Sequence, residues 1–333
     1  MNVWIVVDKL SVEEDGWETH LSSIIQGYVD AKYINARVEE ITEDNIAKLE
    51  GHFRTKYITE NDVFVFANSW TAMTIRIKHW SEVYNRPVKM IGFWSRGCYL
   101  NTDPVYRPKE DRNWRKVFER SSFRCLDKSF FIDDYHKEQF RIYVSKNVFP
   151  SRLNTCKFPM DYLTMTLADK ALEYFKQDII VYPWENQFAL DEKIIYDFIR
   201  AFKNYKVIFA QEKAKMPREQ ILTQIAQSKI AFLPYLHPTI GQEIYECCIL
   251  GTIPLVPDVE GLRHLVPDEF RYPVEWTSNI LNYCMYAPKL TEMITSLMLN
   301  YEDHHRYTLE KQTQYLTKEY FDSEDILTEI FGK

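Results

Sequence analysis

The sequence predicts an α/β protein built from two Rossmann-like domains, each a parallel sheet covered by helices. Apolar runs rich in strand-forming residues alternate with helical patterns along the chain, which is the order that produces parallel sheets. A length of 333 residues allows about two domains with full cores. One stretch, residues 229–258, shows the repeating unit completely: an apolar strand, a loop, a short helix and a second apolar strand.

Composition and charge narrow the class of protein. Hydrophobic residues make up 46% of the chain and aromatic residues 15%, as in globular proteins. The net charge of −7 argues against a protein that coats nucleic acid through its overall charge, although it allows a local basic patch. The chain starts with a short apolar strand and not a signal peptide, and no run reaches transmembrane length. With six cysteines and no CxxC pair, we expect reduced thiols in a soluble, cytoplasmic protein without membrane insertion.

The first half of the chain shows the alternation clearly. Strands are predicted at residues 2–7, 38–41, 62–67, 87–94 and 128–132, with helices at 17–28, at 71–84 and from 114 onward. The run VFVFA at 63–67 is apolar at every position, which indicates a strand buried on both faces. Residues 144–178 mix polarities with Pro150 and Pro159 and are interpreted as the interdomain connection. The two domains are therefore expected at about 1–150 and 151–315.

The second half contains the most informative helix. Strands at 179–182 and 206–210 flank an amphipathic helix at 192–202, and terminal helices are expected at 290–299 and 301–320. Within the 229–258 unit, Gly251 stands where a helix end adopts the left-handed conformation. The loop at 237–242 would leave unpaired N–H groups at a helix N-terminus, where an anion such as phosphate binds. Glu243 and Glu246 lie about 60° apart around the helix and so share a face that can accept hydrogen bonds from ribose hydroxyls. The alternative is a Rossmann-like helix with no ligand.

A resemblance to a known family is carried by residues 246–256. Their sequence, ECCILGTIPLV, resembles the E-A-x-A-x-G-T-P-V-V signature of retaining GT-B glycosyltransferases, and its GTIP variant is similar to that of bacteriophage DNA α-glucosyltransferases. The resemblance implies a nucleotide-sugar donor, with a UDP-sugar favoured, whose ribose is bound by Glu246. It places the donor phosphates on a loop of Thr239, Ile240, Gly241, Gln242 and Glu243. Pro238 stands where many members have a glutamate that touches the donor sugar, so that contact is absent or is supplied by Glu243.

A second segment, residues 15–20, supports the same resemblance. Its sequence DGWETH is similar to the G-G-x-E-x-H segment that opens the first helix of these enzymes, except that Asp15 replaces a glycine. Gly16 lets the backbone approach a ligand, and the helix that follows offers N–H donors. The resemblance implies that this loop faces the cleft near the donor phosphates and the acceptor, with His20 as a catalytic candidate. A structural hydrogen bond from the helix face is the alternative role for His20.

The loop after the strand at 87–94 is a candidate for the acceptor side. It contains Arg96 and Asp103, and the resemblance to phage DNA glucosyltransferases implies a functional aspartate in this loop. Asp103 is the nearest acidic residue, and its alternative role is to cap the turn before Pro104.

A basic run at 107–124 is a candidate for contact with DNA. Arg112, Arg115 and Arg120 lie there among aromatic residues, a combination that can follow a phosphate backbone. A solvated helix face is the commoner meaning of such a run.

The chain departs from the family where the diphosphate is held. The resemblance implies an arginine and a lysine after the strand at 179–182, but residues 183–186 read PWEN. Either Lys193 or Lys213 supplies the positive charge, or the site binds a diphosphate weakly. Neither a zinc-binding spacing nor a D-x-D motif occurs in the sequence, so we expect a metal-independent reaction with no cofactor beyond the nucleotide sugar.

These observations lead to one expected architecture and several possible functions. The resemblance implies the GT-B fold, with a cleft between the domains and a tail helix, 316–333, that packs back on the first domain. It implies transfer of a sugar, with retention, to an acceptor hydroxyl. The favoured acceptor is a hydroxymethylated pyrimidine in phage DNA, which makes double-stranded DNA a possible partner. A polysaccharide, lipid or small molecule is the alternative acceptor, and a non-catalytic nucleotide-binding module of the same fold is the alternative class.

Overall fold

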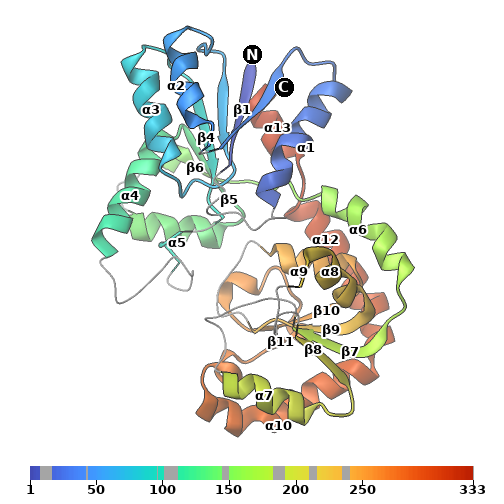
Figure 1. Cartoon of the computed structure of the whole chain (residues 1–333). Helices are drawn as coiled ribbons and strands as arrows, with labels where there is room; N and C mark the ends of the chain where they lie inside the picture. The colour runs from blue at the N-terminus through green and yellow to red at the C-terminus, as the bar shows by residue number, and fades with distance from the viewer. Residues whose placement is uncertain are drawn as a thin grey trace. The chain divides into compact units, whose positions relative to one another are not determined.

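The structure, a computed structural model, consists of two compact α/β units (Figure 1). It describes residues 1–332 except for 8–16, 43, 96, 101–111, 145–149, 183–191, 210–215 and 235–240. Unit 1 comprises Met1–Met160 together with Tyr320–Lys333, and unit 2 comprises Asp161–Glu319. The chain therefore leaves unit 1 once, builds all of unit 2, and returns.

Unit 1 contains a six-stranded sheet in which every neighbouring pair is parallel, as the alternating pattern predicts. The order across the sheet is β2-β1-β3-β4-β5-β6. The strands are β1 (Asn2–Val6), β2 (Arg37–Ile41), β3 (Val63–Phe66), β4 (Lys89–Phe93), β5 (Lys128–Phe131) and β6 (Leu153–Thr155). All four residues of β3 are buried, which confirms the interpretation of its apolar run. Because β2 and β3 lie on opposite sides of β1, the winding direction reverses between β1 and β3.

Helices cover both faces of this sheet (Figure 1). They are α1 (Trp17–Ala31), α2 (Ile46–Arg54), α3 (Met73–Val83), α4 (Arg112–Cys125), α5 (Asp134–Val144) and α13 (Glu324–Phe331). Aromatic rings fill much of the core: the ring of Phe140 on α5 lies 4.5 Å from that of Trp94 and 5.0 Å from that of Phe131. Such packing of large rings fixes α5 against the sheet.

The returning tail is tied to unit 1 by charge and by backbone pairing. Glu329 on α13 forms ion pairs with Lys89 and Lys128, each at 2.6 Å, at the starts of β4 and β5. Burial alone would raise the pKa of the Glu329 carboxyl, but the hydrogen bonds and charges of the two lysines outweigh it and lower the pKa. The backbone of Phe158 also bridges to Phe321.

Unit 2 contains a five-stranded parallel sheet in the order β11-β10-β9-β7-β8. The strands are β7 (Gln177–Tyr182), β8 (Lys206–Phe209), β9 (Ser228–Phe232), β10 (Ile253–Pro257) and β11 (Arg271–Tyr272). The predicted strand–helix–strand unit is present as β9, α9 (Gln242–Ile249) and β10. Gly251 has φ of +70°, which confirms the predicted left-handed helix end. Here the winding direction reverses between β7 and β9.

The remaining elements of unit 2 are mostly helical. The α-helices are α6 (Tyr162–Glu173), α7 (Glu192–Ala201), α8 (Arg218–Gln227), α10 (Ile280–Leu299), α11 (Tyr301–Asp303) and α12 (Glu310–Glu319). A π-helix, η5 (His304–Leu309), joins α11 to α12, and short 3-10 turns η2 (Glu260–Leu262), η3 (Asp268–Phe270) and η4 (Val274–Thr277) follow β10. Within the part of the chain that the structure describes, no helix combines the length and apolar character needed to cross a membrane.

Some predicted boundaries are wrong for identifiable reasons. Residues 144–178 are more than a connection, since they contain β6, which pairs Leu153 with Ser129 of β5, and the helix α6. The helix predicted at 290–299 begins ten residues earlier and passes through Pro288. The nine-residue helix α2 is not among the predicted elements, whereas the eight-residue helix α13 lies within the predicted tail helix at 316–333.

A buried lysine joins the amino ends of three strands of unit 2. Nζ of Lys176, which precedes β7, donates to the carbonyl of Ser228 at 2.9 Å and to Oγ1 of Thr252 at 2.7 Å. Burial lowers the pKa of Lys176 to about 7. This lysine therefore titrates in the folded protein near neutral pH, well below the 10.5 of an exposed lysine.

We predict that Lys176→Met removes part of the rise in stability with pH. Between pH 7 and about 10 the unfolded chain binds a proton at Lys176 that the folded chain has released, so the wild-type free energy of unfolding should rise by up to about 1.4 kcal/mol per pH unit. Urea denaturation at pH 6.5, 7.5 and 8.5 measures this slope. Parallel pH profiles for the wild type and the variant would show that Lys176 keeps its proton in the folded state.

Candidate functional site

The helix α9 begins at the carboxyl edge of the unit 2 sheet, beside the reversal between β7 and β9. Gly241 precedes the helix with φ of +82°, and a Cβ there would lie 2.6 Å from Cδ1 of Leu265. The left-handed backbone conformation therefore favours glycine, and a Cβ would also force the side chain of Leu265 to shift. The N–H groups that follow point out of a helix N-terminus at the place in an open α/β sheet where ligands bind. The predicted phosphate-binding residues Thr239 and Ile240 lie outside the described residues.

Glu246 is held one turn into this helix. Its side chain is 0% exposed, and Oε1 accepts a hydrogen bond from Nε2 of Gln242 at 2.9 Å and pairs with Nη2 of Arg218, the first residue of α8. Arg218 compensates the cost of burying this charge. Glu243, on the same helix, is only half-buried. The sequence analysis identified Glu246 but not Arg218, which lies 28 residues away along the chain.

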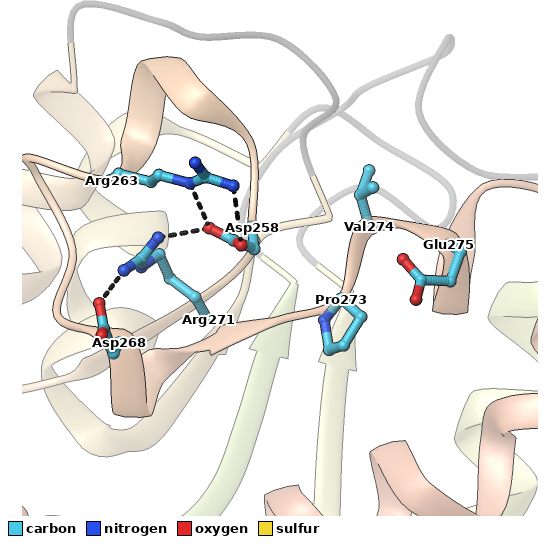
Figure 2. Close-up of a pocket in the computed structure, with 7 residues that line it drawn as sticks. All are labelled: Asp258, Arg263, Asp268, Arg271, Pro273, Val274 and Glu275. Carbon is cyan, nitrogen blue, oxygen red and sulfur yellow. Dashed lines mark hydrogen bonds and ion pairs between the residues drawn. The ribbon is translucent and has the colours of Figure 1, made fainter.

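A pocket of about 530 Å³ lies at the same edge of the sheet, at the ends of β10 and β11 (Figure 2). Asp258 directly follows β10, and Pro273 directly follows β11. The pocket is lined by Asp258, Arg263, Asp268, Arg271, Pro273, Val274 and Glu275. The pocket is not among the sites predicted from the sequence, although an acidic residue directly after a buried strand indicates a polar group at this edge of the sheet.

Two arginines converge on Asp258 in this pocket (Figure 2). Arg263 forms a bidentate pair with it, Nε to Oδ1 at 2.9 Å and Nη2 to Oδ2 at 3.1 Å, and Arg271 pairs with both Asp258 and Asp268. The hydrogen bond from Arg263, together with the charge of Arg271, outweighs partial burial and lowers the pKa of Asp258. The two guanidinium groups are thus already engaged by carboxylates.

The carboxyl edge of the unit 1 sheet also carries buried polar groups. They lie near β1 and β3, between which the winding direction reverses. Glu18, in the first turn of α1, is 4% exposed and accepts a hydrogen bond from Oγ of Ser95 at 3.5 Å. Ser95 follows β4, so the contact joins the carboxyl ends of two strands. His20 is half-buried on the same helix. The predicted site residues Gly16, Arg96 and Asp103 lie outside the described residues.

A buried aspartate–histidine pair lies at the end of β5. Asp133 accepts hydrogen bonds from the backbone N of His136 at 2.7 Å and from its Nδ1 at 2.8 Å, which caps α5 and orients the ring. His136 is 1% exposed, and its Nε2 has no hydrogen-bond partner among the described residues. The sequence carries one signal for this pair, an acidic residue three positions before a histidine at the start of a helix.

The basic helix α4 is less basic at its surface than its sequence suggests. Arg115 is 8% exposed and belongs to the interior of unit 1, which contrasts with the predicted contact with DNA. Arg120 is half-buried, while Trp114 and Val117 are exposed. The side chain of Arg112 lies outside the description. Only part of the predicted basic surface is therefore available on this helix.

The cations predicted to hold the diphosphate are incompletely described. Lys193 is exposed in the first turn of α7, and Lys213 lies in an undescribed loop. Across the residues with described placement, no group of three or more His, Cys, Asp or Glu side chains could hold a metal ion.

The sequence matches no protein-family model and no curated protein, but the fold matches solved structures. Sucrose-phosphate synthase (tll1590) from Thermosynechococcus elongatus has a TM-score of 0.60 at 12% identity, over 99% of this chain and 97% of that one. WaaG, a glycosyltransferase involved in lipopolysaccharide biosynthesis, has a TM-score of 0.59 at 13% identity over 100% of both chains. This chain has the GT-B fold.

A further GT-B structure is similar over nearly the whole length. It is an alpha-glucosyltransferase in complex with UDP and a 13-mer DNA containing an HMU base, with a TM-score of 0.52 at 13% identity, over 99% of this chain and 98% of that one. At such low identity the three similarities establish the GT-B fold of the chain and leave its substrates to be argued from its own residues.

We predict that Gly241→Ala destabilises the protein by about 1–3 kcal/mol, because alanine disfavours the left-handed conformation and its Cβ would clash with Leu265. Gly27→Ala is the matched control. Gly27 lies within α1, and a Cβ added there would meet nothing within 4 Å, so alanine should stabilise by about 0.5–1 kcal/mol. Urea denaturation compares the two, and equal stability would contradict the conformation assigned to Gly241.

Proposed function

We propose that this protein is a glycosyltransferase that moves a sugar, with retention, from a nucleotide-sugar donor to an acceptor hydroxyl, and that a UDP-sugar is the donor. The observation that carries the proposal is the placement of Gly241 and Glu246 on a GT-B fold, at the reversal point of the unit 2 sheet. A helix N-terminus there can receive the diphosphate, and a carboxylate one turn behind it can receive the ribose.

Three residues of α9, Gln242, Glu243 and Glu246, have roles in this proposal. The N–H groups after Gly241 stabilise the negative charge that grows on the departing diphosphate. Glu246 accepts hydrogen bonds from the ribose hydroxyls, while Arg218 and Gln242 fix the orientation of its carboxylate. Thr239, Ile240 and Glu243 complete the phosphate loop, and Lys193 or Lys213 adds positive charge. In this proposal no metal ion or other cofactor takes part.

The reaction follows from this arrangement. The bond between the sugar's anomeric carbon and the diphosphate oxygen breaks as the acceptor oxygen bonds to the same carbon on the same face. The acceptor's proton passes to the leaving diphosphate, so no protein nucleophile is needed. His20 and Asp103 are proposed beside the acceptor, with Gly16 letting the backbone approach the donor phosphates.

The favoured acceptor is a hydroxymethylated pyrimidine in DNA. The GTIP motif and the similarity to an alpha-glucosyltransferase solved with UDP and HMU-containing DNA support it. Arg96, Arg112, Arg115 and Arg120 would then contact the DNA, although Arg115, at 8% exposed, offers little of its side chain. The net charge of −7 and the similarity to WaaG favour instead a polysaccharide, lipid or small-molecule acceptor. A non-catalytic nucleotide-binding module is favoured by Pro238 and by the missing arginine.

We predict that nucleotide binding depends on Glu246. A nucleotide sugar at a hundred times its Kd should stabilise the wild type by about 2.7 kcal/mol. Glu246→Gln should raise Kd by about tenfold or more, because hydrogen bonds from the ribose to a carboxylate are lost. The control is Glu292→Gln on the exposed side of α10.

Thermal shift against nucleoside diphosphates and nucleotide sugars gives the readout. Equal nucleotide affinities of the wild type and Glu246→Gln would contradict the proposed contact between Glu246 and the ribose. No shift with any nucleotide or nucleotide sugar would reject the donor site itself.

We predict that the double variant Arg112→Glu, Arg120→Glu abolishes glycosylation of DNA but leaves slow hydrolysis of the donor unchanged. Reversing two charges should weaken the contact with DNA phosphates. Each lost contact should reduce the slope of log K against log salt concentration by about one. Lys318→Glu on the exposed side of α12 is the control. Unaltered transfer to DNA would contradict the assignment of α4 to the acceptor.

A further inference from the structure

The pocket at the ends of β10 and β11 has no part in the function proposed above. Figure 2 shows two groups of side chains in it. Arg263 and Arg271 converge on Asp258 on one side, and Glu275 lies on the other side, beyond Pro273 and Val274. The volume of about 530 Å³ falls in the range of small-molecule sites.

The charges of the pocket argue against a phosphate or another anion. Three carboxylates and two guanidinium groups line it, so its net charge is −1. Both arginines already contact Asp258, so much of the positive charge that an anion would need is already neutralised. It would also lie beside Asp268 and Glu275, whose charges repel it. A neutral ligand avoids both costs.

The hydrogen-bonding groups suit a ligand rich in hydroxyls. A sugar hydroxyl both donates and accepts, so it can bridge a carboxylate and a guanidinium without displacing either. Arg271 supplies donors for such a ligand through the remaining N–H bonds of its terminal nitrogens. Its side chain is 10% exposed, and its pairs with Asp258 and Asp268 hold the guanidinium group at the pocket wall. The carboxylate of Glu275 is exposed and makes no ion pair with a described residue. Pro273 and Val274 offer apolar surface for the face of a sugar ring.

The position of the pocket fits the donor. The strands β9 and β10 are direct neighbours, with Ile230 in register with Ile253, and β11 is the next strand along. Neighbouring strands lie about 5 Å apart, so the pocket begins about 5–10 Å from the strand end that leads into α9. A sugar attached to a diphosphate bound at the N-terminus of α9 can span this distance.

We propose that this pocket binds the sugar ring of the nucleotide-sugar donor, with Glu275 and Arg271 as the residues that contact its hydroxyls. The proposal rests on the function proposed above, because the sugar is delivered there by the nucleotide. Asp258 is a positioning residue that holds both arginines in place.

The test separates the sugar from the nucleotide. Kd is measured by calorimetry for UDP and for UDP-glucose, UDP-galactose and UDP-N-acetylglucosamine, on the wild type, Glu275→Gln and Glu275→Ala. Glu275 is exposed, so neither substitution should disturb folding, and Glu292→Gln is the control. We expect Kd of the preferred nucleotide sugar to rise about tenfold in both Glu275 variants, while Kd of UDP stays unchanged.

Two outcomes overturn the proposal. Unchanged Kd values for the nucleotide sugar would show that Glu275 does not contact the sugar, and an equal loss for UDP would show that the pocket serves the nucleotide. Saturation-transfer NMR with free glucose, galactose and N-acetylglucosamine distinguishes these failures from failure of the proposed function. One such result is a protein that binds a free sugar but no nucleotide, with sugar binding lost in Glu275→Ala. That result would support the sugar pocket and reject the transferase function. No saturation transfer to any sugar, in a protein that also binds no nucleotide, would reject both.

Discussion

Parallel strand pairing is the constraint on which both units depend. Because all strands of a sheet run in one direction, every loop that leaves a carboxyl end reaches the same edge. In unit 2 this brings α9, Asp258 and Pro273 to one edge from three successive strands. In unit 1 it brings Glu18, Ser95 and Asp133 to one edge in the same way. The polar residues of each unit thus gather without being close in sequence.

Charge at these edges is balanced pair by pair. Glu246 is matched by Arg218, and Asp258 by Arg263 and Arg271. Glu246 is 0% exposed, so burying its charge without Arg218 would cost several kcal/mol, and this pair must form as the sheet forms. The same pairing keeps the guanidinium groups from acting as open anion sites. This separates a helix N-terminus suited to an anion from a neighbouring pocket suited to a neutral ligand.

Local patterns in the sequence predict much of the fold. The apolar strands, the parallel sheets, the unit of β9, α9 and β10, and the left-handed Gly251 are all found as predicted. The failures share one cause, which is stabilisation by distant residues. Strand β6 has three residues of mixed polarity and exists because it pairs with β5, and α10 continues through Pro288 although that residue marks a helix end in an isolated pattern.

The same limit applies to the candidate site. A short motif identifies Glu246, but its partner Arg218 and the grouping of Asp258 with Arg271 arise from tertiary structure. Arg115 illustrates the reverse case, since a basic residue in a basic run is only 8% exposed. A sequence pattern can locate candidate site residues that lie within one helix or strand. Tertiary packing decides which residues from other elements lie beside them.

The return of the chain to unit 1 also orders its assembly during synthesis. Unit 2 is continuous in sequence, so a nascent chain can complete its sheet as soon as Glu319 has left the ribosome. Unit 1 begins first but finishes last, because α13 carries the carboxylate that neutralises Lys89 and Lys128. Until α13 emerges, the part of unit 1 that was synthesised first exposes the apolar surface that α13 covers. Lys89 and Lys128 also lack their ion pairs with Glu329 during this time. The length of this interval is set by the time needed to translate all of unit 2.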